Sequence, residues 1–168
     1  MSAIRSLVLL VPLAVGAVPL SQPTAAAADE ASSFPQPVAD WIQQARTDCP
    51  GGFADRGAVH EADLTGDGRT GYLADPHLLS CAGSPHLFGG TGPASIELFV
   101  TAPSGAVVHT GGVLALGYHI EPAPSGPPTI VFDTHDIKDE TGSFDAYRWD
   151  GHNFAMVDHK SMAAPPVQ

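Results

Sequence analysis

The sequence predicts a mainly β fold of the α+β class, in which one N-terminal helix packs on an antiparallel β-meander and one disulfide bond is present. Helical periodicity occurs in a single stretch, residues 38–47. The apolar segments after it are short and rich in Val, Ile, Phe and Tyr, which is typical of strands. Gly and Pro, 18 and 16 in number among 168 residues, separate these segments and indicate turns between them.

Residues 1–28 have the pattern of a secretory signal peptide. Arg5 is followed by an apolar run over residues 7–20, and three alanines then form a small-residue cleavage site before Asp29. The run is broken by Pro12 and Pro19, whereas a membrane-spanning helix needs about 20 apolar residues. We therefore expect cleavage and a periplasmic or secreted bacterial protein with no membrane association afterwards. What remains is one domain of about 140 residues, enough for a single core.

The helix follows a polar leader, residues 29–36, and opens the domain, residues 37–159. Val38, Trp41, Ile42 and Ala45 fall on one helical face, and the proline and two glycines at 50–52 end the helix. Hairpin turns are expected at 65–68, 103–105, 111–112 and 150–151. Residues 75–94 and 121–128 are expected as irregular connections, and residues 160–168 as a disordered tail. The predicted strands are residues 58–62, 70–74, 95–101, 106–110, 113–120, 129–133, 144–149 and 153–157.

The cysteines, Cys49 and Cys81, both lie in the expected mature chain. An even number of cysteines in an exported protein predicts a disulfide bond. A cysteine metal site or a thiol nucleophile is the weaker interpretation, because the chain has no C-x-x-C spacing and export places it in an oxidising compartment.

The segment from Asp63 to Gly71 contains the opening half of a calcium-binding loop. Asp63, Thr65 and Asp67 stand at ligand positions 1, 3 and 5, and Arg69 offers its backbone carbonyl at position 7. Ca²⁺ is the cofactor that this pattern predicts. The ligand count is poor, since the twelfth position is Ala74 instead of Glu. The alternative, weighed equally, is a tight turn in which the aspartates accept backbone hydrogen bonds.

Histidines and acidic residues suggest a second kind of site. His109, His119 and His135 fall on or near three successive predicted strands, where facing side chains can share a zinc ion. With Asp133 or Asp136 they predict, as an alternative function, a small zinc-dependent hydrolase. Separate histidines with hydrogen bonds of their own are the more common arrangement, so we assign no catalytic residues.

Residues 61–72 resemble the D-x-N-x-D-G-x-x-D-[YLF] calcium loop of FG-GAP/VCBS-type repeats. From Trp41 to the closing stretch 147–154, the chain is also similar to a group of small exported bacterial proteins of unassigned function. These share a D-L-N-G-D-G hairpin, a Gly/Cys loop before an apolar strand and a terminal R-W-[ND]-G-x-x-F hairpin. The resemblance implies the fold and the exported location, and no activity. Gly71 stands where the repeat loop has an acidic ligand, and residues 88–93 lack the cysteines of the group.

The formal net charge of −11 argues against nucleic acid as a partner, because its binders need a basic surface. The leading hypothesis is an exported, non-catalytic, monomeric module that binds an unknown protein or envelope component. Its charge favours a basic partner. A further alternative is therefore an inhibitor or immunity-type protein that acts against a cationic wall-degrading enzyme.

Overall fold

The computed structural model describes residues 33–136 and 141–161. The expected signal peptide, the first half of the leader (residues 29–32), residues 137–140 and residues 162–168 lie outside this part of the chain. The elements, in chain order, are the helix α2 (Gln36–Asp48), β1 (Phe53–Asp55), β2 (Val59–Ala62), β3 (Gly71–Ala74), the 3-10 helix η2 (Pro76–Leu78), β4 (Leu79–Cys81), β5 (Ala94–Thr101), β6 (Val107–Ala115), β7 (Gly117–Glu121), β8 (Thr129–Asp136), β9 (Thr141–Trp149) and β10 (Phe154–Ser161).

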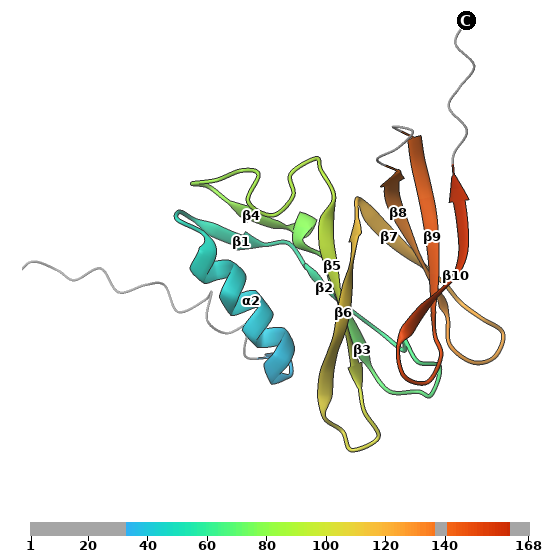
Figure 1. Ribbon diagram of the computed structural model, residues 1–168. Coiled ribbons are helices and arrows are strands. Elements are labelled where there is room, and N and C mark those ends of the chain that lie inside the picture. The colour runs from blue at the N-terminus through green and yellow to red at the C-terminus, as the bar shows by residue number, and fades with distance from the viewer. Residues whose placement is uncertain (1–32, 137–140, 162–168) are drawn as a thin grey trace, which may run out of the picture.

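These elements form three layers, which lie side by side in Figure 1. Helix α2 is the first layer, the sheet with strand order β2-β3-β5-β6 is the second, and the sheet β10-β9-β8-β7 is the third. A short ribbon of β1 and β4 extends beside the helix. All strand pairs are antiparallel, which confirms the predicted mainly β fold with one α-helix in the described ranges. The expected single meander is divided into two four-stranded meanders.

The helix forms where the sequence predicts it and packs through the predicted face. Val38, Ile42 and Ala45 are its buried residues. Val38 belongs to an apolar cluster with Tyr72 and Phe99 of the second layer. The helix begins after Pro35, whose carbonyl accepts hydrogen bonds from the first turn, and it ends before Cys49, whose backbone is extended. None of the helices in the described ranges is long and apolar enough to span a membrane.

The main core lies between the two four-stranded sheets. It contains Leu64, Leu73, Ile96, Leu98, Ala115, Ile130 and Phe132. Neighbouring residues of one strand point to opposite faces, so Leu73 joins this core while Tyr72 packs toward the helix. Tyr118 of β7 borders the core, and burial, with a smaller contribution from the charge of Asp75, raises the pKa of its hydroxyl to about 12.

The disulfide bond between Cys49 and Cys81 is confirmed, with the two Cα atoms 5.6 Å apart. It joins the end of α2 to β4, a strand that pairs with β1. Both short strands were missed by the sequence analysis, which expected residues 75–94 to be irregular. The same connection is also held by His77, whose ring nitrogens lie 2.8 Å from Asp75 Oδ1 and 2.9 Å from the Gly92 carbonyl oxygen.

The predicted turn at Gly111 and Gly112 is wrong, because both residues lie inside β6. The pairing of β6 with β5 shifts at this point, and the shift leaves Thr110 as an extra residue in the strand. A Cβ atom at Gly112 would lie 2.4 Å from Ser95 Oγ of the facing strand, so this glycine makes room for a neighbour instead of a turn. At the other end of the domain, β10 continues to Ser161, two residues into the predicted tail.

Candidate functional site

The third layer leaves one face of its sheet bare. Its inner face packs on the main core, and no helix or strand in the described part of the chain covers the opposite face, which we call the outer face (Figure 1). Residues that alternate along each strand point outward there, among them Val131 of β8 and Ala146 of β9. Val131 is nevertheless only 9% exposed, so the taller side chains around it form a depression.

The register of the strands explains this depression. Val131 and Ala146 face each other in the middle of the sheet, between His119 on β7 and Asp158 on β10. Ala146 has only a methyl group, whereas its outward neighbours on β9, Phe144 and Arg148, are long. The result is a hollow of about 540 Å³, lined by His119, Glu121, Thr129, Val131, Phe144, Ala146, Arg148, Val157, Asp158 and Lys160.

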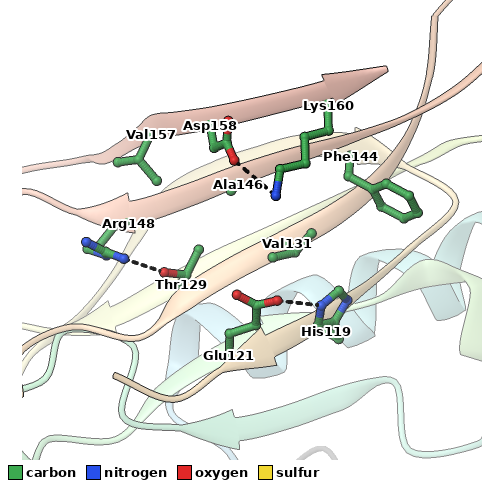
Figure 2. A pocket seen from close by; sticks show the side chains of 10 residues that line it. All are labelled: His119, Glu121, Thr129, Val131, Phe144, Ala146, Arg148, Val157, Asp158 and Lys160. Atoms are coloured by element: carbon green, nitrogen blue, oxygen red, sulfur yellow. Dashed lines mark hydrogen bonds and ion pairs between the residues drawn. The ribbon is translucent and has the colours of Figure 1, made fainter. Parts of the chain in front are cut away.

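Figure 2 shows how these side chains lie around the hollow. Phe144 lies toward one end and Arg148 with Thr129 toward the other, and the two long sides carry charged pairs. His119 Nε2 lies 3.3 Å from Glu121 Oε1 on one side, and Lys160 Nζ lies 3.4 Å from Asp158 Oδ2 on the other. All four of these side chains are more than half exposed, so each pair contributes little to stability.

Arg148 is the exception among the charged side chains of the hollow. Its Nη2 donates a hydrogen bond to Thr129 Oγ1 at 2.7 Å. It forms no ion pair with any carboxylate in the described ranges. Two of the five lysines and arginines in these ranges, Arg148 and Lys160, line the hollow, although the chain as a whole is strongly acidic.

The hydroxyl and imidazole groups of the hollow do not contact each other. Thr129 carries the one hydroxyl group among the lining residues, and it accepts a hydrogen bond from Arg148. The imidazole of His119 pairs with Glu121 and makes no described hydrogen bond to that hydroxyl. A nucleophile in contact with its base, which covalent catalysis requires, is therefore not formed by the lining residues.

The predicted histidines do not come together. His109 of β6 lies beside the helix, in a groove with Trp41, and its Nε2 is 2.6 Å from Glu97 Oε2. His119 lies on the outer face of the third layer, so both sheets and the core separate the two rings. The side chains of His135 and Asp136 lie outside the described part, and Asp133 is half-buried on β8. The residues that are described form no group of three metal-ligating side chains.

The predicted calcium loop is closed by its own hydrogen bonds. The Asp63 carboxylate accepts from the backbone amides of Thr65, Gly66, Asp67 and Gly68, at 2.7 to 3.3 Å. The Arg69 guanidinium pairs with Asp67 and also donates to the Thr101 carbonyl. Desolvation raises the pKa of Asp67, but the backbone hydrogen bond from Arg69, the hydroxyl of Thr65 and the positive charge of Arg69 together hold this pKa below its usual value. These contacts resemble the tight-turn alternative.

A polar network that the sequence analysis missed joins β8, β9 and β10. Asp145 lies 2.5 Å from His159 Nδ1 through one carboxylate oxygen and accepts from Thr134 Oγ1 at 3.2 Å through the other. Thr134 Oγ1 also lies 2.9 Å from Ser143 Oγ. The Thr134 hydroxyl thus contacts the Asp145 carboxylate, and this network ties β8, β9 and β10 together.

Comparison of the chain with protein-family models, with curated proteins and with solved structures finds no match.

Proposed function

We propose that the protein is an exported, non-catalytic binding module and that the outer face of the β7–β10 sheet is its recognition surface. The observation that carries this proposal is the hollow of about 540 Å³, which lies on the sheet face that no described element covers. Binding sites for small ligands are concave and combine apolar side chains with polar groups that fix the ligand. The hollow is concave, with an apolar floor of Val131 and Ala146 and six polar or charged side chains around it.

Export is part of the proposal and has two supports. The pattern of residues 1–28 is that of a signal peptide. The disulfide bond between Cys49 and Cys81 is a bond that forms and persists in oxidising compartments. The unknown partner is then a component of the periplasm, the cell envelope or the surroundings.

The test uses a variant that fills the hollow without touching the core. In the wild type, the methyl group of Ala146 points outward at the centre of the outer face. In Ala146→Leu, a larger side chain occupies this place. Immobilised wild-type protein and this variant are exposed to periplasmic extract and culture medium. Val108→Leu, an enlargement at a 42% exposed position of β6, is the matched control.

We expect a component that wild type and Val108→Leu both retain and that Ala146→Leu loses. Equal retention by all three proteins, or retention of nothing, would contradict the proposal. The same experiment at low and high salt identifies a basic partner, such as a cationic wall-degrading enzyme, because attraction by the charge of −11 weakens as salt screens it.

A further inference from the structure

We propose that the hollow binds a ligand that joins a carboxylate group to an apolar body, with Arg148 as the residue that holds the carboxylate. This inference rests on the proposed function and specifies the ligand of the same site. It follows from the charge around Arg148, from the strand register and from the position of the apolar side chains.

The guanidinium of Arg148 is available for an anion. An arginine has five N–H donors in a planar fork that matches a carboxylate. The structure gives Arg148 one hydrogen bond, which its Nη2 donates to Thr129 Oγ1. Arg46, Arg56 and Arg148 all lack a carboxylate partner among the described residues, and of these three only Arg148 lies in the hollow. A ligand carboxylate would supply the partner that the described residues do not.

The acidic side chains of the hollow do not prevent this. Glu121 is in the same cross-strand row as Arg148, but β8 lies between their strands, which separates the two backbones by about 10 Å. Its carboxylate is directed to His119, as Figure 2 shows. Asp158 pairs with Lys160 and lies in the next row, opposite Ala146.

The apolar body follows from what lies next to Arg148. Val131 and Ala146 form the floor of the hollow, and Phe144 closes its far end (Figure 2). Positions 144 and 148 of one strand are about 13 Å apart, so a ligand anchored at Arg148 extends over the floor toward the phenyl ring. Burial of its apolar part against these side chains supplies hydrophobic free energy that a bare anion lacks.

Three probes separate the two parts of the ligand. Hexanoate has both a carboxylate and an apolar chain, hexanamide has the chain without the charge, and inorganic phosphate has the charge without the chain. Binding of each is followed through the backbone amide signals of the protein by NMR. For ligands of this size we expect a hexanoate dissociation constant on the order of 1–10 mM.

Variants assign the contacts. Arg148→Gln should weaken hexanoate binding about tenfold, since it removes a charge-assisted hydrogen bond, and leave hexanamide binding unchanged. Arg56→Gln, at an exposed arginine in the turn between β1 and β2, is the matched control and should bind hexanoate like wild type. Ala146→Leu should abolish binding of both hexanoate and hexanamide.

Each contrary result has a definite meaning. If hexanamide binds as tightly as hexanoate, or if Arg148→Gln has no effect, the carboxylate assignment is wrong while the hollow remains a binding site. If phosphate binds as tightly as hexanoate, the proposal that the ligand has an apolar body is wrong. If no probe binds at about 50 mM, above the expected constant, this inference fails, and retention of an extract component still decides the proposed function separately.

Discussion

The contact between the Asp63 loop and the connection from β7 to β8 gives a prediction of definite size. Gly66 has a φ of +72°, and a Cβ atom there would lie 2.2 Å from the Gly126 carbonyl carbon and 2.3 Å from the Pro127 nitrogen. A left-handed conformation costs a residue with a side chain about 1–2 kcal/mol. The clash is with backbone atoms, which no rotamer change can avoid, and such overpacking costs about 1–3 kcal/mol more. Gly66→Ala should therefore lower the free energy of unfolding by about 2–5 kcal/mol.

Gly68 offers the matched control two residues away. Its φ is +84°, and a Cβ atom there would meet nothing within 4 Å. Gly68→Ala should lose only the conformational part, about 1–2 kcal/mol. Urea unfolding of wild type and both variants, analysed with the slopes checked for equality, measures the difference. Equal losses in the two variants would refute the reasoning, because they would show that the two loops do not constrain each other.

Three further predictions concern the disulfide, a buried tyrosine and the calcium loop. Replacing Cys49 and Cys81 by Ala opens a loop of sequence separation 32 and should cost about 3–4 kcal/mol in urea unfolding; an unchanged midpoint would contradict this. Because the pKa of Tyr118 is raised to about 12 from 10.0, the stability that Tyr118 contributes is constant below pH 10 and is lost as pH rises toward 12; absorbance at 295 nm should show a late step that Tyr118→Phe lacks. Calcium should raise the melting temperature more in Arg69→Ala than in wild type, because in the wild type the Arg69 guanidinium already neutralises the negative charge of Asp67. An unchanged melting temperature in both proteins would show that the segment is a turn and not a calcium site.

The helix and most strands could be predicted because local patterns decide them. Val38, Ile42 and Ala45 are buried at the spacing of a helical face, and Tyr72 and Leu73 are divided between two layers by the alternation of a strand. The even number of cysteines, together with the expected export, was sufficient to predict the disulfide. The helix and the strands are predicted from residues near one another in the sequence. The disulfide is predicted because two cysteines allow only one pairing.

The features that could not be predicted depend on partners far away in the sequence. Gly111 and Gly112 lie inside β6 because this segment pairs with β5, and a Gly-Gly pair alone indicates a turn equally well. The strand β4 is short and forms through its pairing with β1. The hollow exists because Ala146 lies opposite Val131, which only the register of β8 and β9 determines. The alternation around Arg148 was visible in the sequence, but nothing there showed which face would stay uncovered.

The most direct test of the recognition surface is a map of the amide signals that change when the component retained from extract is added to the labelled protein. The account predicts changes centred on Val131 and Ala146, in the middle of the outer face, and none of them in Ala146→Leu. Changes centred on the groove beside Trp41 and His109, or on the Asp63 loop, would contradict it.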